Sequence, residues 1–151
     1  MELVQLSSPI HDRTPPLQSL APMLTQLLKA KIHQATVTFT DVNYHGSITI
    51  DADLLRASGL LPNEAVIVAD CENGNRFTTY VIVGKPGSGT IGVNGAAARL
   101  TQVGHRVIIM AFVMATPQEI ATHKARVVIV DKANKPAETV EHPSTLDSYS
   151  R

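Results

Sequence analysis

The dipeptide Gly46-Ser47 joins a residue without a side chain to a hydroxyl nucleophile, within a run typical of a strand. The serine hydroxyl can attack the carbonyl carbon of Gly46, which converts the amide between the two residues into an ester. Elimination across the Cα–Cβ bond of Ser47 then breaks the chain and leaves dehydroalanine, which hydrolyses to a pyruvoyl group. This chemistry requires a strained backbone at Gly46, which glycine tolerates. The alternative for so common a dipeptide is an ordinary entry into a strand.

Two cations and two hydroxyl groups are candidates for binding a carboxylate substrate and moving its protons. Arg76 offers a planar fork of donors that matches a carboxylate, and Lys31 offers a point charge. The alternative is that both are solvated surface charges. Tyr80 could donate a proton from a neutral phenol, and Thr79 could hydrogen-bond to a developing enolate oxygen.

Strand geometry separates some of these candidates. In a single strand, Arg76, Thr78 and Tyr80 share one face, whereas Phe77 and Thr79 share the other. Arg76, Thr79 and Tyr80 therefore meet in one site only if a bulge, a twist or a second subunit contributes.

Other chemistries are disfavoured by residue spacing. The six histidines show no pair at ligand spacing such as i, i+4, so we expect no metal site. Two of them, His33 and His45, flank the expected active site and could tune it; the alternative is that they lie on a strand surface. The run 84–89 has its lysine too early for a phosphate-binding loop and is expected to form a turn. Asp51 is expected to cap a helix that ends at Gly59.

Composition excludes several classes of partner. Thirteen basic and thirteen acidic residues give no net charge, so no basic surface for nucleic acid is expected. The first twenty residues lack the order of a signal peptide, and no apolar run is long enough to span a bilayer. The single cysteine cannot form an internal disulfide. We therefore expect a cytoplasmic protein that does not enter a membrane.

The elements that must position the candidate residues are mostly short strands. Alternating or buried apolar patterns predict six strands, at residues 35–40, 47–50, 65–69, 76–83, 106–114 and 127–130. Asn73-Gly74 predicts a hairpin turn, and Thr116 to Glu119 has the layout of a capping box. Short strands with a few one- or two-turn helices predict a mainly β fold, either a small barrel or a sandwich.

The chain is expected to form one domain with two extensions. Residues 1–22 are rich in Pro and Ser without periodicity and predict a flexible N-terminal extension. Residues 23–131 carry the strand patterns, and residues 132–151 predict a polar C-terminal tail.

Taken together, the motifs resemble those of bacterial aspartate 1-decarboxylase, a pyruvoyl-dependent enzyme. The resemblance covers about residues 23 to 130. It rests on these runs, in this order: Lys31-Ile32-His33, Tyr44-x-Gly46-Ser47, Asn73-Gly74-x-Arg76-Phe77-x-Thr79-Tyr80 and Val93-Asn94-Gly95-Ala96-Ala97-Ala98. Several motifs in the right order are far more specific than any one of them.

This resemblance implies a fold, an assembly and an activity. The fold would be a small six-stranded double-psi β-barrel with a few short helices, assembled as a homotetramer with sites between subunits. An inactive precursor would cleave itself between Gly46 and Ser47. The product would decarboxylate L-aspartate to β-alanine and CO2 for pantothenate biosynthesis, using a covalent pyruvoyl group with no metal and no PLP.

The resemblance also assigns roles to individual residues. Ser47 would become the pyruvoyl group that forms a Schiff base with the substrate, and Tyr80 would be the proton donor. The substrate would be bound by Thr79, Gly95, Ala96, Ala97, Arg76 and Lys31, with Tyr44 and Asn94 lining the site. Thr79 would also assist cleavage, and the loop from Gly95 to Ala97 would contribute backbone N–H groups.

Two features depart from the family pattern, and two alternatives stay open. His45 stands where many members carry an acidic residue, which bears on the rate of self-cleavage; members often start near Met23, so the N-terminal extension is unusual. One alternative function is an uncleaved β-barrel that acts as a binding or assembly module without catalysis. Another is that cleavage requires an accessory maturation factor.

Overall fold

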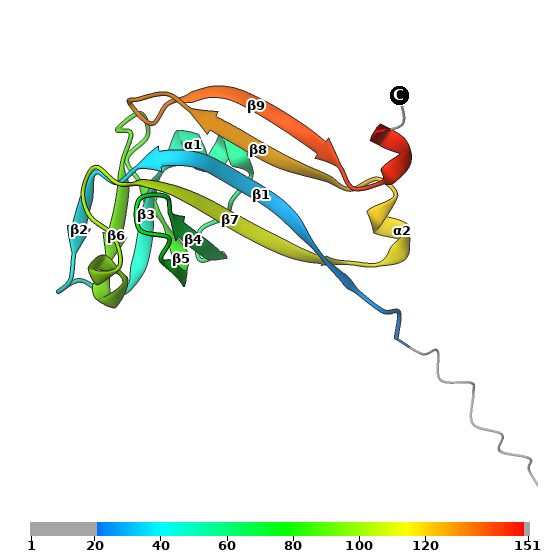
Figure 1. The fold of residues 1–151 in the computed structure, drawn as a ribbon, viewed down its shortest axis with the longest axis horizontal. Coiled ribbons are helices and arrows are strands. Elements are labelled where there is room, and N and C mark those ends of the chain that lie inside the picture. Colours follow the sequence, from blue (N-terminus) through cyan, green and yellow to red (C-terminus); the bar gives the residue numbers. More distant parts are fainter. Residues whose placement is uncertain (1–20, 150–151) are drawn as a thin grey trace, which may run out of the picture.

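Nine strands join side by side in the computed structural model, which describes residues 21–149 (Figure 1). The strands are β1 (Thr25–Thr36), β2 (Phe39–Asp41), β3 (Ser47–Asp51), β4 (Ala65–Asp70), β5 (Arg76–Gly84), β6 (Ile91–Asn94), β7 (Arg106–Ala115), β8 (Lys124–Val130) and β9 (Pro136–Pro143). The helices are α1 (Ala52–Ser58) and α2 (Pro117–Ile120), with two 3-10 turns, η1 (Gly95–Arg99) and η2 (Leu146–Tyr149). The expectation of a mainly β fold with a few short helices is confirmed.

The hydrogen-bonded order of the strands is β2-β6-β3-β5-β4-β7-β1-β8-β9. The pairs β2–β6, β3–β5 and β1–β8 are parallel, and the other five pairs are antiparallel. Strand β3 therefore lies between β5 and β6, two strands that follow it in the chain by about thirty to forty residues. This placement brings the start of β3 next to segments that are distant in the sequence.

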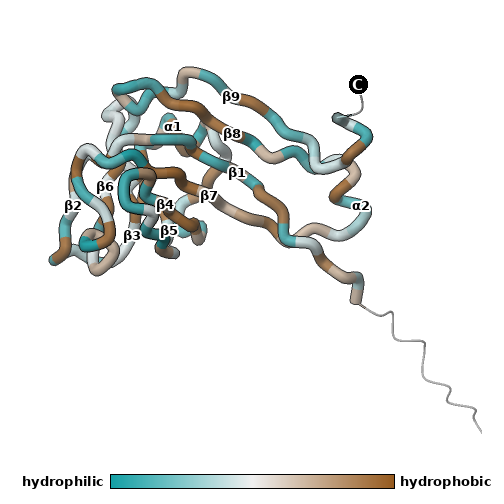
Figure 2. The backbone as a smooth tube through the Cα atoms, in the orientation of Figure 1, coloured by the Kyte–Doolittle hydropathy of each residue, from teal (hydrophilic) through white to brown (hydrophobic). Residues whose placement is uncertain are grey.

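Side chains from one face of this sheet and from α1 fill most of the core. The largest fully buried ones are Ile32, Ile48, Ile50, Leu54, Ile91, Ile109, Val37, Val66, Val68, Val81, Val93 and Val107. Burying each side chain of this size contributes roughly 1.5–3 kcal/mol. Figure 2 shows apolar segments along β7 and β8, whereas the turn between β8 and β9 is more polar.

The helix signals in the sequence are confirmed. Asp51 caps α1 by accepting a hydrogen bond from the backbone N–H of Asp53, and Gly59 ends the helix with a φ of 76°. Thr116 and Glu119 form both hydrogen bonds of a capping box at α2. Asp51 also accepts hydrogen bonds from the N–H groups of two glycines in the 84–89 turn, which ties that turn to the end of β3.

The structure has more strands than the six expected. The expected strand 35–40 divides, because β1 continues only to Thr36 and β2 begins at Phe39. Strand β6 occupies residues where no strand was expected. Strand β9 lies in the expected polar tail, because main-chain pairing with β8 holds it without a buried apolar face. The expected extension 1–22 lies almost entirely outside the described residues.

The long strands β1 and β7 pair antiparallel from Thr25↔Ala115 to Thr36↔Arg106. Figure 1 shows them running away from the packed strands β3 to β6 toward α2. Phe112 and Met114 on β7 are 37% and 52% exposed, so this arm presents apolar side chains on its surface. Among the described residues, no helix is both long enough and apolar enough to cross a membrane.

Candidate active site

Ser47 is the first residue of β3 and is completely buried. On one side it pairs with Asn94, the last residue of β6, in antiparallel register. On the other side β3 runs parallel to β5, with Ile48 opposite Val81, the residue after Tyr80. The start of β3 therefore lies between the end of β6 and the middle of β5, where three of the sequence motifs converge.

The hydroxyl of Ser47 accepts one hydrogen bond and donates another. Asn94 Nδ2 donates to Ser47 Oγ over 2.9 Å, and Asn94 is itself 2% exposed. Ser47 Oγ donates a longer hydrogen bond of 3.4 Å to the carbonyl oxygen of His45. A hydrogen bond donated to Oγ favours the build-up of negative charge on this oxygen, which is what a nucleophile needs when it loses its proton.

A glycine after β6 packs directly on the backbone before Ser47. A Cβ atom at Gly95 would lie 2.7 Å from Gly46 Cα and 2.9 Å from Gly46 N, closer than real Cβ atoms approach. Gly95 also has a φ of +71°, which disfavours any other residue. By contrast, Gly46 has no positive φ, and a Cβ there would meet nothing within 4 Å. The expected backbone strain at Gly46 is therefore wrong for this structure, and the steric demand for glycine falls on Gly95.

The expected substrate-binding residues of β5 and η1 differ in their exposure. Tyr80 is 40% exposed, Thr79 is half-buried, and the two alternate between faces of β5 as strand geometry requires. In η1, Ala96 is exposed and Ala97 is half-buried against the core.

Tyr44 precedes the site and is 50% exposed. Its ring packs edge-on against the ring of His45, with centroids 5.8 Å apart. His45 is exposed, and its carbonyl rather than its ring contacts Ser47.

Among the described residues, neither of the two expected carboxylate-binding cations hydrogen-bonds to Ser47. Arg76 begins β5 four residues before Tyr80, about 13 Å along the strand, and its guanidinium donates to the carbonyl of Gly74 over 3.2 Å. Lys31 lies on β1, and strands β7, β4 and β5 separate β1 from β3. Both cations are therefore separated from Ser47 along the sheet.

His33 stands two residues from Lys31 on β1. Its Nδ1 atom is buried and has no hydrogen-bond partner among the described residues. Burial lowers the pKa of His33, and the positive charge of Lys31 lowers it further. His33 is therefore biased toward its neutral form.

Sequence reasoning missed a second hydroxyl in the site. Asn94 Nδ2 also donates to Thr49 Oγ1 over 3.1 Å. Thr49 stands two residues after Ser47, on the same face of β3, which is the signal that could have found it. The partner Asn94 could not be found this way, because it lies 45 residues further along the chain.

Sequence reasoning also missed a buried carboxylate beside the loops that precede Arg76 and follow η1. The Asp70 side chain is fully buried, and its Oδ2 accepts hydrogen bonds from Thr101 Oγ1 at 2.6 Å and His105 Nδ1 at 2.7 Å. Its Oδ1 accepts from the backbone N–H groups of Glu72 and Asn73. Burial alone raises the pKa of Asp70, but these four hydrogen bonds outweigh it and hold the pKa below its ordinary value.

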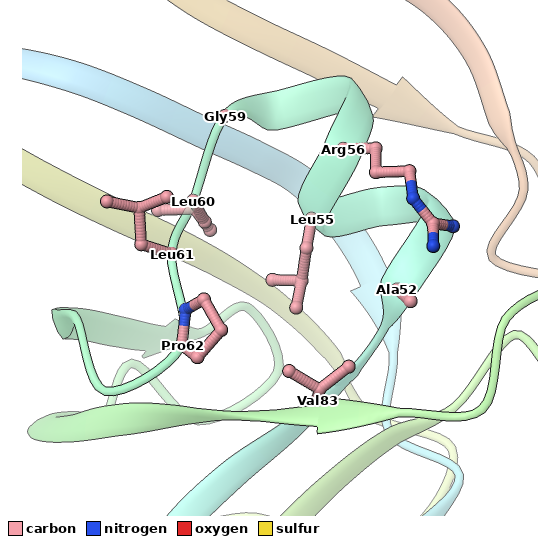
Figure 3. Close-up of a pocket in the computed structure, with 8 residues that line it drawn as sticks. All are labelled: Ala52, Leu55, Arg56, Gly59, Leu60, Leu61, Pro62 and Val83. Atoms are coloured by element: carbon pink, nitrogen blue, oxygen red, sulfur yellow. The ribbon is translucent and has the colours of Figure 1, made fainter.

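An apolar hollow in the described part of the chain lies away from Ser47. It has a volume of about 320 Å³ and is lined by Ala52, Leu55, Arg56, Gly59, Leu60, Leu61, Pro62 and Val83 (Figure 3). Its one charged side chain, Arg56, pairs with Asp53 at 2.7 Å. This hollow is mainly apolar and adjoins α1, so it shares no residue with the candidate site.

The fold and the site define a small, mainly β protein in which a buried serine begins a central strand. Residues 23–137 match the family described as aspartate decarboxylase. The aspartate 1-decarboxylase of Caldicellulosiruptor saccharolyticus is 58% identical over 113 residues, which cover 75% of this chain and 88% of that protein. The aspartate 1-decarboxylase of Neisseria meningitidis is 52% identical over 126 residues, 82% of this chain and 99% of that protein. The chain belongs to the aspartate decarboxylase family, as its motifs indicated.

Proposed function

We propose that this chain decarboxylates L-aspartate to β-alanine and CO2, and that it first converts its own Ser47 into a pyruvoyl group. Family membership supports the reaction. The observation that carries the role of Ser47 is its geometry: a buried hydroxyl accepts a hydrogen bond from Asn94, directly after a glycine on which Gly95 packs. The β-alanine formed would serve pantothenate biosynthesis.

The proposed cleavage balances with one water molecule. Ser47 Oγ bonds to the carbonyl carbon of Gly46, the C–N bond breaks, and the hydroxyl proton moves to the Ser47 nitrogen. Loss of the Cα proton of residue 47 then breaks its Cβ–O bond, which releases Gly46 as a carboxylate. Water hydrolyses the resulting dehydroalanine to pyruvoyl and ammonia. The products are chains 1–46 and 47–151.

The residues around position 47 fit such a group. Ser47 is fully buried, and the absent side chain of Gly95 leaves the backbone of Gly46 in close contact with η1. A pyruvoyl carbonyl supplies an electron sink for the electron pair left when CO2 departs. Around it, Tyr80 donates a proton to the substrate carbon, Thr79 donates a hydrogen bond, and backbone N–H groups of the Gly95–Ala97 loop orient the substrate, with Tyr44 lining the site.

Arg76 and Lys31 bind the substrate carboxylates, and they act across a subunit boundary. The register Lys31↔Met110, Met110↔Ile67 and Ile67↔Thr78 puts Lys31 three strands from Thr78, about 14 Å at the spacing of neighbouring strands. We infer that a cation held this far along the sheet from β5 acts on Ser47 of a second copy of the chain.

The proposed assembly is a homotetramer of double-psi barrels, with sites between neighbouring subunits. The exposed apolar side chains of the β1–β7 arm support it, because a soluble protein covers such a surface through association. A hollow of about 240 Å³ beside Thr78 and Phe112, on the same part of the sheet, offers a place for a neighbouring side chain.

The decisive experiment follows purified chain over time by mass spectrometry and assays β-alanine from L-aspartate. We expect two fragments split between Gly46 and Ser47, the larger one without a free amino terminus, together with β-alanine formation. Ser47→Ala should stay intact and inactive. An intact, inactive parent chain would contradict the proposal and favour the binding module. If cleavage occurs only with cell extract, an accessory factor is required.

A further inference from the structure

The amide nitrogen of Asn94 joins two hydroxyl groups of β3. It donates to Ser47 Oγ at 2.9 Å and to Thr49 Oγ1 at 3.1 Å. A side-chain amide nitrogen carries two hydrogens, so both are committed. The register explains why this occurs: Ser47 pairs with Asn94, and Thr49 is the next residue of β3 on the same face.

The bond from Asn94 to Ser47 is buried, and the bond to Thr49 is partly buried. The residue opposite Thr49 on β6 is Gly92, and a Cβ there would overlap the ring of Phe39. Opposite residues of an antiparallel pair point to the same side, so the Phe39 ring lies on the face that carries Ser47, Thr49 and Asn94. Hydrogen bonds shielded from water are stronger, and losing one partner costs more.

The bond to Thr49 restricts rotation of the Asn94 amide about its Cβ–Cγ bond. With one hydrogen held by Thr49, the other stays directed at Ser47 Oγ. Ser47 then accepts from Asn94, and its own hydrogen is directed to the carbonyl of His45. Without Thr49, the amide could turn its oxygen toward Ser47 and accept that hydrogen instead. Such a turn would remove the donor that stabilises negative charge on Oγ.

We propose that Thr49 is a positioning residue for self-cleavage: through Asn94 it holds a hydrogen-bond donor on Ser47 Oγ and so speeds attack on the Gly46 carbonyl. This inference rests on the proposed cleavage of the Gly46–Ser47 bond. It concerns the attack of Ser47 Oγ on the Gly46 carbonyl, during which an N–H of the Asn94 side-chain amide points at Oγ. Once residue 47 has become pyruvoyl, it has lost Oγ, so Thr49 has no equivalent role in turnover.

The test compares the cleavage rates of purified precursors by mass spectrometry. Thr49→Val keeps the shape of the side chain and removes the hydroxyl, and we expect cleavage about threefold to tenfold slower, the loss of one neutral hydrogen bond. Thr49→Ser keeps the hydroxyl and should cleave within about twofold of the parent. Thr139→Val makes the same chemical change on β9, far from Ser47, and should cleave like the parent.

A second readout separates positioning from general structure. Thr49→Val that has been allowed to cleave fully should turn over aspartate with a kcat per pyruvoyl group close to that of the parent. If Thr49→Val is poorly folded by circular dichroism, Thr49→Ala takes its place with the same expectation. Cleavage of the folded variant at the parent rate, or equal slowing in Thr49→Ser, would overturn the inference and leave the proposed function standing. A parent chain that never cleaves would overturn both.

Discussion

Gly95 lies so close to Gly46 that a Cβ atom on Gly95 would come within 2.7 Å of Gly46 Cα. The two glycines are 49 positions apart, and pairing of Ser47 with Asn94 brings them together. The loop expected to hold the substrate therefore packs on Gly46, the residue before the bond expected to be cut. A substitution that moves this loop away from Gly46 should therefore slow cleavage and weaken substrate binding.

Gly95→Ala should slow cleavage and weaken substrate binding together. The added methyl group must displace either the Gly46 backbone or η1, and it also meets the unfavourable φ of +71°. We expect cleavage at least about tenfold slower, measured by mass spectrometry, and a higher KM in whatever material matures.

Gly74→Ala is the matched control for this prediction. Gly74 has a φ of +77°, but a Cβ there would meet nothing within 4 Å. The Gly74→Ala substitution should cost about 1–2 kcal/mol of stability through backbone strain alone. Cleavage should stay near the parent rate. Equal effects of the two variants on cleavage would show that the contact between Gly95 and Gly46 is unimportant.

Mixing two inactive variants should restore activity if the cations act across subunits. Lys31→Ala keeps a cleavable Ser47, and Ser47→Ala keeps Lys31. In co-expressed mixed oligomers, some sites combine an intact Ser47 from one chain with an intact Lys31 from its neighbour. We expect β-alanine formation to recover to roughly a quarter of the parent activity, since about one random pairing in four is productive.

The control for this mixing experiment is the double variant Lys31→Ala/Ser47→Ala, co-expressed with Lys31→Ala. This combination holds no intact Lys31 and should stay inactive. No recovery in the first mixture, with both chains present in the purified oligomer, would place Lys31 and Ser47 of a working site in the same chain.

The buried Asp70 should make stability depend on pH. Its hydrogen bonds hold its pKa in the folded chain below the ordinary value, although burial opposes them. The stabilising contribution is therefore complete above the unfolded pKa of about 3.9, and is lost as the pH falls through the lower, folded pKa. Urea unfolding between pH 3 and 7 should show the free energy of unfolding falling at the acid end.

Asp70→Asn should flatten part of this pH dependence and lower stability at pH 7, because the neutral amide accepts fewer of the four hydrogen bonds. Asp51 also has a lowered pKa, so part of the dependence of the unfolding free energy on pH remains in this variant. Asp147→Asn, an exposed site in η2, is the control and should leave the curve unchanged. An unaltered slope in Asp70→Asn would contradict the prediction.

Features that depend on neighbouring residues could be predicted from the sequence. Asp51 and Gly59 delimit α1, and Thr116 with Glu119 caps α2, because these signals lie within one turn of helix. The family also follows from the sequence, since ordered motifs such as Gly46-Ser47 and Asn94-Gly95 are linear. The candidate residue list came from the same motifs.

Only the tertiary structure decided how these residues meet. The bonds from Asn94 to Ser47 and Thr49 depend on β3 lying beside β6, and strand pairing over more than forty residues leaves no local periodicity to read. The same holds for Asp70 with His105, and for the steric demand at Gly95 rather than at Gly46. The sequence by itself determined which chemical groups are present and to which family the chain belongs. Long-range strand pairing determined which residues lie next to each other. The local sequence does not reveal this pairing, because the backbone hydrogen bonds that set the register are the same for every side chain.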